Sequence, residues 1–329
     1  MAAGGHPWRP MGLESVGGHG AELGAEALVP ALIVLIVCLA VIAANVVIIA
    51  TIVSMSGPKE VIKYYLLSLA ASDLLAGCVV APLSVYPALV HQWVYGAHVC
   101  RLMGYLKVTL WASQAYTLMW IGVDRYLAIV KPLRYDTIQT KVRCQCWVAV
   151  SWLSAMVLCC PPVLGLSSPL YDAGAYICLA DWSDMLGYSA TVAMMVLGPP
   201  VITSSYTYGF IFHMAARVRT SYAQTLDKEY LSAVVENLAN PDIVMTFVLT
   251  VLFWLSWLPY IGLRLFEFAA GAPVDAPFLH FSLFWMGMLN SVWKLLVYLV
   301  ASEDFRRGLR SLCRSLCCLC RRSASPVPV

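Results

Sequence analysis

The chain has 329 residues, of which 60% are hydrophobic and only 12% are charged, and its mean hydropathy is +0.76. This composition excludes an ordinary soluble domain and indicates a protein that crosses the membrane several times. The net charge of +3 fits membrane topology and contact with lipid headgroups, and it gives no reason to expect a nucleic-acid partner. The sequence has no glycine-rich phosphate loop, no His-Glu-x-x-His pair and no credible Ser/His/Asp set. We therefore expect no enzyme activity, no cofactor and no metal site.

Seven apolar runs are long enough to form helices that cross about 30 Å of hydrocarbon, which takes roughly 20 residues each. They cover residues 28–53, 63–87, 98–130, 144–165, 187–213, 243–270 and 278–300. The expected fold is an all-α membrane protein, a seven-transmembrane helix bundle. Residues 1–27 would form an extracellular N-terminal tail, 28–300 the seven-transmembrane domain, and 301–329 a short amphipathic eighth helix with a cytoplasmic tail.

Lysine and arginine gather in every second connection between these runs. They follow the first run (Lys59, Lys63), the third (Lys131, Arg134, Lys141, Arg143), the fifth (Arg217, Arg219, Lys228) and the seventh (Arg306, Arg307, Arg310, Arg314, Arg321, Arg322). Because connections rich in these residues stay in the cytoplasm, the N-terminus is expected outside the cell. The predicted location is the plasma membrane.

The triplet Asp124-Arg125-Tyr126 places an ion pair at the inner end of the third run, and a charge within a membrane helix is a functional hypothesis by default. Further polar and aromatic residues punctuate the other runs: Asn45, Asp73, Trp93, Cys100, Trp152, Pro200, Tyr208, Phe253, Trp257, Pro259, Tyr260, Tyr298 and Phe305. In this order and spacing they resemble the rhodopsin-like (class A) G-protein-coupled receptors over nearly the whole chain. Within that family the chain resembles the orphan receptors on the amine-receptor-like side.

The resemblance implies that the triplet is an activation switch. Arg125 would pair with Asp124 at rest, and an outward swing of the sixth helix would free it to meet the C-terminal helix of a Gα subunit. The remaining members of the switch would be Tyr126, Tyr208, Phe253, Trp257, Pro259 and Tyr298. A purely structural ion pair is the alternative interpretation.

Some family members also hold this arginine with an acid at the foot of the sixth helix, and the corresponding position here is Ala239. A resting state without that contact lacks a charge-assisted interaction of roughly 1 to 3 kcal/mol, which is enough to shift a two-state population. We therefore expect substantial ligand-independent activation of heterotrimeric G proteins. Glu236 and Asp242 lie close enough in sequence to replace the missing acid.

The seventh run departs from the family pattern Asn-Pro-x-x-Tyr, because it reads Lys-Leu-Leu-Val-Tyr from Lys294 to Tyr298. In the family that asparagine helps to build a sodium pocket around the acid of the second helix, here Asp73. Since an unpaired carboxylate at this depth is expensive, we expect an ion pair between Asp73 and Lys294, with Gln114 and Asn290 as hydrogen-bonding neighbours. Such a receptor would be insensitive to sodium. The alternative is that Lys294 snorkels toward the cytoplasm.

Two other function classes compete with the receptor interpretation. Opsins carry retinal on a seventh-helix lysine ten residues before the tyrosine, which is Met288 here, whereas Lys294 is four residues before it and nearly two helical turns deeper. A transporter would show pseudo-symmetric repeats and paired broken helices, and neither is visible in the sequence.

The expected ligand cavity excludes a biogenic monoamine, because the aspartate that pairs with an amine is replaced by Lys107. The cavity would be lined by Lys107, Trp111, Trp257, Tyr260, Arg264, Glu267 and Trp285. Two cations among aromatic rings suit a carboxylate or phosphate on an apolar body, such as a lipid-like acid.

Internal neutralisation of those two cations is an equal alternative. Glu267 lies three residues after Arg264 on the same helical face, and Asp172, Asp181 and Asp184 of the second outer loop are placed to cover Lys107. If that loop fills the cavity, the receptor is partly self-activated and needs no acidic ligand.

The cysteines agree with this topology. Cys100 and Cys178 fall on the outer, oxidising side, where a disulfide persists, and the resemblance implies a bridge between the third helix and the second outer loop. Four cysteines near the C-terminus favour S-palmitoylation, and they are Cys313, Cys317, Cys318 and Cys320. The short inner loops and tail offer few phosphorylation sites, so arrestin is expected to bind weakly.

Overall fold

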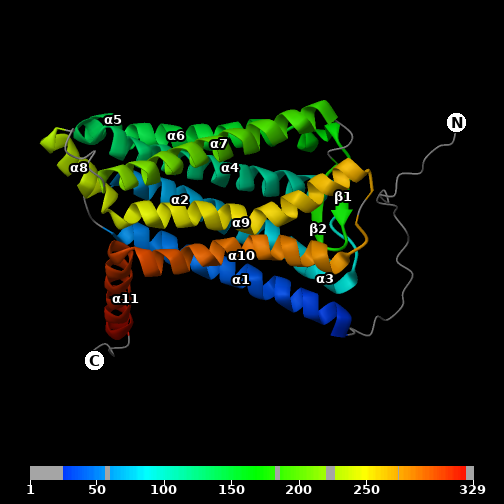
Figure 1. The fold of residues 1–329 in the computed structure, drawn as a ribbon. Helices are drawn as coiled ribbons and strands as arrows, with labels where there is room; N and C mark the ends of the chain where they lie inside the picture. Colours follow the sequence, from blue (N-terminus) through cyan, green and yellow to red (C-terminus); the bar gives the residue numbers. More distant parts are fainter. Residues whose placement is uncertain (1–24, 56–59, 182–185, 220–226, 273, 324–329) are drawn as a thin grey trace, which may run out of the picture.

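A computed structural model describes residues 25–55, 60–181, 186–219, 227–272 and 274–323, and for residues 25, 26, 60 and 316–323 it describes the backbone alone. Long helices lie side by side and form a bundle (Figure 1). They are α1 (Ala25–Ser54), α2 (Glu60–Leu75), α4 (Gly96–Val130), α6 (Lys141–Cys159), α7 (Leu186–Val218), α9 (Pro241–Ala270) and α10 (Pro277–Ala301).

Further elements lie at the two ends of the bundle (Figure 1). One end carries α3 (Val85–Val90), which continues α2 through a π-helical segment (Ala76–Val80) and a 3-10 segment (Ala81–Ser84), a π-helical turn after α6 (Pro162–Leu166), and the strands β1 (Pro169–Asp172) and β2 (Ile177–Ala180). The other end carries a 3-10 turn (Pro132–Arg134), α5 (Tyr135–Ile138), α8 (Lys228–Leu238) and α11 (Glu303–Ser323). These are named the hairpin end and the α8 end below.

The long helices form a seven-transmembrane bundle, as the sequence predicted. Within the described part of the chain, six segments are apolar and long enough to cross a membrane: Ala27–Ser54, Val61–Val90, Lys141–Leu166, Leu186–Val218, Pro241–Ala270 and Pro277–Ala301. The remaining helix, α4, is more polar because it carries Arg101, Lys107, Asp124 and Arg125. It tolerates these charges because it packs against α2, α6, α7 and α9, so protein rather than lipid surrounds much of it.

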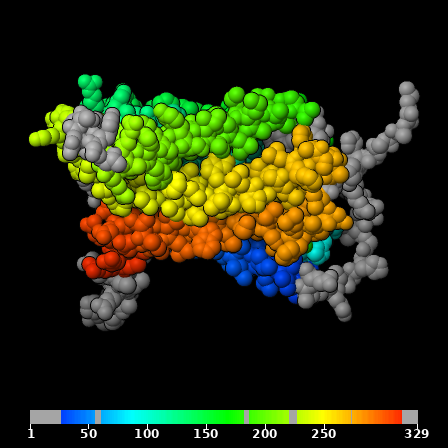
Figure 2. Space-filling view, in the orientation of Figure 1, coloured from blue at the N-terminus to red at the C-terminus, as the bar shows by residue number. Residues whose placement is uncertain are grey.

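The outer faces of the bundle expose large apolar side chains, as helices that face lipid do. Ile36 on α1, Ile202 on α7, Leu255 on α9 and Val300 on α10 are among the exposed residues. One such face, formed by α7, α9 and α10, is seen in Figure 2. The residues buried inside the bundle form a second set, distinct from these exposed apolar residues. This buried set includes most of the charged and polar side chains discussed below.

The hairpin was absent from the predicted elements. Strands β1 and β2 pair antiparallel, with Pro169 opposite Ala180 and Asp172 opposite Ile177. The predicted disulfide between Cys100 on α4 and Cys178 on β2 is confirmed. This bridge holds the hairpin against the third helix of the bundle, so the second loop lies over the interior of the hairpin end.

The connection between the fifth and sixth helices contains a separate helix, α8, which the sequence had not predicted. The break after α8 follows from two adjacent residues, Asn240 and Pro241. A residue before proline is driven out of the helical region, and Asn240 is extended with φ −69° and ψ 121°. Its side chain then caps α9 by accepting a hydrogen bond of 2.9 Å from the backbone N–H of Asp242, while Pro241 takes the favourable first helical position.

The close approach of α9 and α10 depends on Gly287. A methyl group at this position would lie 2.9 Å from the ring of Trp257, which is closer than packed carbon atoms allow. Glycine therefore lets the Trp257 ring lie against the α10 backbone, midway between the two ends of the bundle.

Candidate functional site

The Asp124-Arg125 pair lies at the α8 end and is buried. Arg125 donates to Asp124 through both Nε, at 3.0 Å, and Nη2. Asp124, which has no exposed surface, also accepts from the Tyr135 hydroxyl at 2.9 Å and from Gln139 Nε2 at 2.8 Å. Burial is the main cause that raises the pKa of Tyr135 above its usual value, and the negative charge of Asp124 raises it further. The Tyr135 hydroxyl therefore keeps the proton that it donates.

Arg125 has a second acidic neighbour on the sixth helix. Its Nη1 atom lies 4.0 Å from Oδ2 of Asp242, which is in the first turn of α9 because the helix begins at Pro241. Ala239 is outside α9 altogether and caps the end of α8. Of the two acids that the sequence offered as replacements for the one missing at Ala239, Asp242 is therefore the acid that lies near Arg125.

Three other predicted members of the switch are tyrosines. Tyr126 faces α7, where its ring contacts Tyr206 and Phe210. Tyr208 and Tyr298 are buried, and their hydroxyl oxygens have no hydrogen-bond partner among the described residues.

The aromatic members of the predicted switch fill the middle of the bundle. Phe253 has no exposed surface, and its ring stacks on Trp111 of α4 with 5.6 Å between centroids. Trp257 packs edge-on against Tyr260 and Phe284. Pro259 lies within α9, where its ring removes one helical hydrogen bond. A movement of α9 must therefore rearrange this aromatic layer.

Asp73 and Lys294 form a buried ion pair between α2 and α10. Lys294 Nζ lies 2.8 Å from Asp73 Oδ2 and 2.8 Å from Gln114 Oε1. The side-chain amide of Gln114 completes the triangle by donating to Asp73 Oδ1 at 2.8 Å. Lys294 therefore points into the bundle rather than toward either end. Asn290 is buried nearby in sequence, but its Oδ1 atom has no hydrogen-bond partner within the described part of the chain.

A narrow cavity of about 20 Å³ lies above this pair and is the inner part of the predicted ligand site. Its lining includes Asp73, Lys107, Trp111, Gln114 and Trp257. This volume is enough for about one water molecule. The cavity as it stands is far smaller than the several hundred Å³ of a typical site for a drug-sized ligand.

The side-chain amine of Lys107 lies in the lining of that cavity. Its Nζ atom is buried and has no hydrogen-bond partner among the described residues. The rings of Phe284 and Tyr260 lie near it, with centroids 5.2 and 6.0 Å away, so cation–π attraction offsets part of its desolvation. Of the acids expected to cover it, Asp172 is engaged elsewhere and Asp184 lies outside the described residues.

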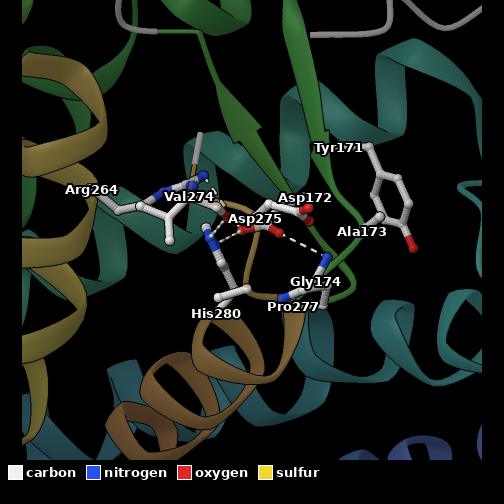
Figure 3. Close-up of a pocket in the computed structure, with 10 residues that line it drawn as sticks. Tyr171, Asp172, Ala173, Gly174, Arg264, Val274, Asp275, Pro277 and His280 are labelled. Atoms are coloured by element: carbon white, nitrogen blue, oxygen red, sulfur yellow. Dashed lines mark hydrogen bonds and ion pairs between the residues drawn. The ribbon is translucent and has the colours of Figure 1, made fainter. Parts of the chain in front are cut away.

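Arg264, the second predicted cation, is neutralised by two carboxylates, of which Asp172 is drawn in Figure 3. Its Nη1 atom lies 2.7 Å from Glu267 Oε2, and Nη2 lies 3.5 Å from Asp172 Oδ2. His280 joins the same cluster from α10, with Nδ1 3.2 Å from Asp172 Oδ2 and Nε2 3.1 Å from Glu267 Oε1. A cavity of about 110 Å³ adjoins these residues at the hairpin end.

The second loop enters the bundle next to this cluster. The indole N–H of Trp285 donates to the carbonyl of Ala175 at 3.1 Å. Ala175 and Ile177 have no exposed surface and belong to one apolar cluster with Tyr260 and Phe284. Loop residues therefore occupy the upper part of the space that the sequence assigned to a ligand.

The sequence of the chain is similar to those of known proteins. A family model described as 7 transmembrane receptor (rhodopsin family) matches residues 44–298. The chain belongs to this family. Mouse G-protein coupled receptor 52 is 28% identical over 274 residues, covering 79% of this chain and 74% of that protein. Mouse probable G-protein coupled receptor 21 is 28% identical over 268 residues, covering 78% and 75%. Human G-protein coupled receptor 161 is 25% identical over 327 residues, covering 91% and 61%.

Membership in the rhodopsin family gives the chain its general role. It is a multi-pass plasma-membrane receptor, in a family of receptors rather than enzymes, and coupling to G proteins follows from the family. Rhodopsin-family motifs had located the triplet, the disulfide and the aromatic layer. They missed His280, Tyr135 and Gln139, since a single histidine, tyrosine or glutamine carries no sequence signal without its partners.

The cysteines predicted to carry lipid are only partly described in this rhodopsin-family receptor. Cys313 is exposed on α11. The side chains of Cys317, Cys318 and Cys320 lie outside the described residues. Phe305, near the start of α11, is buried beside Tyr298 with 5.4 Å between ring centroids, which anchors α11 to the end of α10.

Proposed function

We propose that this receptor activates heterotrimeric G proteins without a ligand because its own second extracellular loop supports the active state. The observation that carries the proposal is the burial of Ala175 and Ile177 among the aromatic residues of the ligand site. The hydrogen bond from Trp285 to Ala175 ties the loop to the seventh helix as a bound ligand would. The hairpin end would face the outside of the cell, in line with the distribution of Lys and Arg.

The contact between Arg125 and Asp242 limits how large this activity is. It replaces the acidic contact that is missing at Ala239. The expectation of spontaneous signalling rested on that missing contact. Ligand-independent activity therefore rests on the loop rather than on a weakened switch. Arg125 would meet the Gα C-terminal helix after α9 moves away, with Tyr208 and Tyr298 as its supports.

The Trp285→Phe variant tests this proposal, because it keeps an aromatic ring but removes the N–H that binds Ala175. One neutral hydrogen bond contributes about 1 kcal/mol, so basal output relative to surface receptor is expected to fall about fivefold. Basal cAMP, calcium and inositol phosphate are measured in parallel. Trp293→Phe is the matched control, since Trp293 lies exposed on the same helix. Wild-type output equal to that of mock-transfected cells would contradict the proposal.

An acidic amphiphile is the second candidate function, and the unpaired ammonium of Lys107 is what favours it. A carboxylate that displaced the loop would pair with Lys107 while its apolar body lay among the aromatic rings. This mode of binding requires the narrow cavity to open, so loop and ligand would compete for one place.

The test compares oleate with oleyl alcohol, its uncharged counterpart. We expect oleate alone to change second-messenger output, and Lys107→Met to raise the required oleate concentration about tenfold or more, as loss of a charge-assisted contact predicts. Lys107→Arg keeps the charge and should retain most of the response. Equal responses to both lipids, or an unaltered Lys107→Met variant, would exclude this ligand class at Lys107.

We propose three further properties. The pair of Asp73 and Lys294 would replace the family's sodium site, which makes signalling independent of sodium. The cysteines at 313, 317, 318 and 320 would be palmitoylated and hold α11 against membrane lipid, and loss of hydroxylamine-sensitive acyl labelling in a variant with four serines would verify this. Arrestin would bind weakly, and strong phosphorylation-dependent recruitment would contradict that expectation.

A further inference from the structure

His280 lies between two carboxylates at the hairpin end, and both of its ring nitrogens face oxygen acceptors. Nδ1 lies 3.2 Å from Asp172 Oδ2. Nε2 lies 3.1 Å from Glu267 Oε1 and 3.2 Å from the carbonyl oxygen of Val274. The carboxylates come from β1 and α9, and the histidine belongs to α10, so one side chain joins three separate elements. Figure 3 shows His280 beside Asp172 and Arg264.

This geometry favours an imidazolium ion. A neutral imidazole has one N–H and one lone pair, so one of its nitrogens would face a carboxylate oxygen without a hydrogen between them. Only the protonated ring donates from both nitrogens. The neighbouring charges favour the same form, because the carboxylates of Asp172 and Glu267 both lie against the ring, while Arg264 is the one cation that pairs with them among the described residues.

We propose that His280, Asp172 and Glu267 form a binding site for an extracellular proton, which fastens the second loop to the sixth and seventh helices. Asp172 is the last residue of β1, and its Oδ1 atom also accepts from the backbone N–H groups of Gly174 and Ala175. The proton therefore holds the turn that carries Ala175 into the bundle. Asp275 is exposed at the adjoining cavity and gives solvent protons a short route to the cluster.

The groups that face His280 set the pH range of this site. Burial alone would raise the pKa of Asp172, but the hydrogen bond from His280 and the charge of Arg264 hold it below its usual value. A carboxylate with a lowered pKa stabilises the fold above about pH 4 and loses that contribution as the pH falls further. Protonated histidine acts in the opposite sense, because its contribution is lost as the pH rises. The loop is thus held between an acidic limit set by carboxylates and an alkaline limit set by His280.

Thermal unfolding of the purified full-length receptor tests the site without any signalling assay. Between pH 6.5 and 9.5 we expect the midpoint of the wild type to fall by about 2–4 °C, as His280 loses its proton. His280→Gln should unfold at a lower temperature at pH 6.5 and show no such fall. Glu267→Gln removes one of the two charges that hold the proton, so its fall should begin at a lower pH than in the wild type.

His91→Gln is the matched control, because His91 also contacts the hairpin, with Nδ1 3.3 Å from the Tyr176 hydroxyl. This variant should keep the wild-type pH response. A flat wild-type profile, or an undiminished fall in His280→Gln, would overturn the proton site.

The signalling consequence rests on the proposed self-activation by the loop. If both inferences hold, raising the extracellular pH from 6.5 to 9.5 lowers basal output in the wild type and leaves His280→Gln unchanged. A His280-dependent change in the unfolding midpoint without any change in basal output would support the proton site and refute self-activation. The two inferences can therefore fail separately.

Discussion

Replacing Lys294 with methionine is expected to remove most of the receptor from the cell surface. Lys294 and Asp73 are 1% and 2% exposed, and the variant leaves the Asp73 carboxylate with one hydrogen bond, from Gln114. Breaking a buried pair by removing one partner costs about 3–5 kcal/mol, which is a large fraction of the stability of a typical protein. Surface receptor is measured by labelling an epitope on intact cells, and Asp73→Leu should lose surface receptor to a similar extent.

A double variant separates the effect of losing the charge pair from the nonspecific destabilisation that any substitution at these positions causes. Asp73→Lys combined with Lys294→Asp should recover surface expression, because it restores opposite charges at the same two positions. Lys63→Met serves as the control for loss of a lysine, since Lys63 donates a hydrogen bond to the carbonyl of Met55 at the edge of the bundle and takes no part in the charge pair. Failure of the charge swap to recover expression would count against the pair.

The buried pair also predicts how the wild-type receptor responds to sodium. In the wild type, Lys294 occupies the side of Asp73 that a sodium ion would require, so basal output should be equal in sodium and in choline buffers. A sodium response in the wild type would show that the ammonium leaves the carboxylate often enough for the ion to enter.

Replacing Asp124 with asparagine is expected to raise basal output by about 10-fold or more. The change removes a fully buried carboxylate that holds Arg125, and charge-assisted hydrogen bonds contribute about 1.5–3 kcal/mol each. Asp242 at 4.0 Å then remains the acid nearest the arginine. Second-messenger output is normalised to surface receptor, because an unpaired Arg125 also lowers folding stability.

A graded series distinguishes the two acids that surround Arg125. Asp242 is 18% exposed at its side chain, where solvent weakens the attraction, so Asp242→Asn should raise basal output by only about two- to fivefold. Asp136→Asn changes an exposed carboxylate on α5 and should have no effect. Equal output from all three variants would mean that neither contact restrains the resting state.

Periodicity and composition were sufficient to predict the membrane helices, because a helix that crosses lipid needs a long apolar segment. Such segments are visible in the sequence. The pairing of Lys294 with Asp73 was also predictable, since a charge at that depth needs a partner. The hairpin and α8 were missed because their stability comes from contacts distant in sequence. Val234 of α8, for example, is buried against Ile129, Tyr208 and Ile211, which no local pattern reveals.

The cluster around His280 was only half predictable. Glu267 follows Arg264 by one helical turn, so their contact could be expected from spacing alone. Asp172 and His280 are 108 residues apart, and they meet because the disulfide places the hairpin over the bundle. Arg264 therefore changed from a candidate ligand-binding cation to a neutralised member of a structural network, while Lys107 remained unpaired.

The boundary formed by Asn240 and Pro241 affects how this receptor compares with its relatives. When positions are counted back from Pro259, the acid at the foot of the sixth helix is missing. By that count, the receptor would be described as lacking the acidic contact to its arginine. In space, the helix restart at Pro241 brings Asp242 to Arg125 from a different position. A contact to the arginine can thus be present even though the acid comes from another position along the chain.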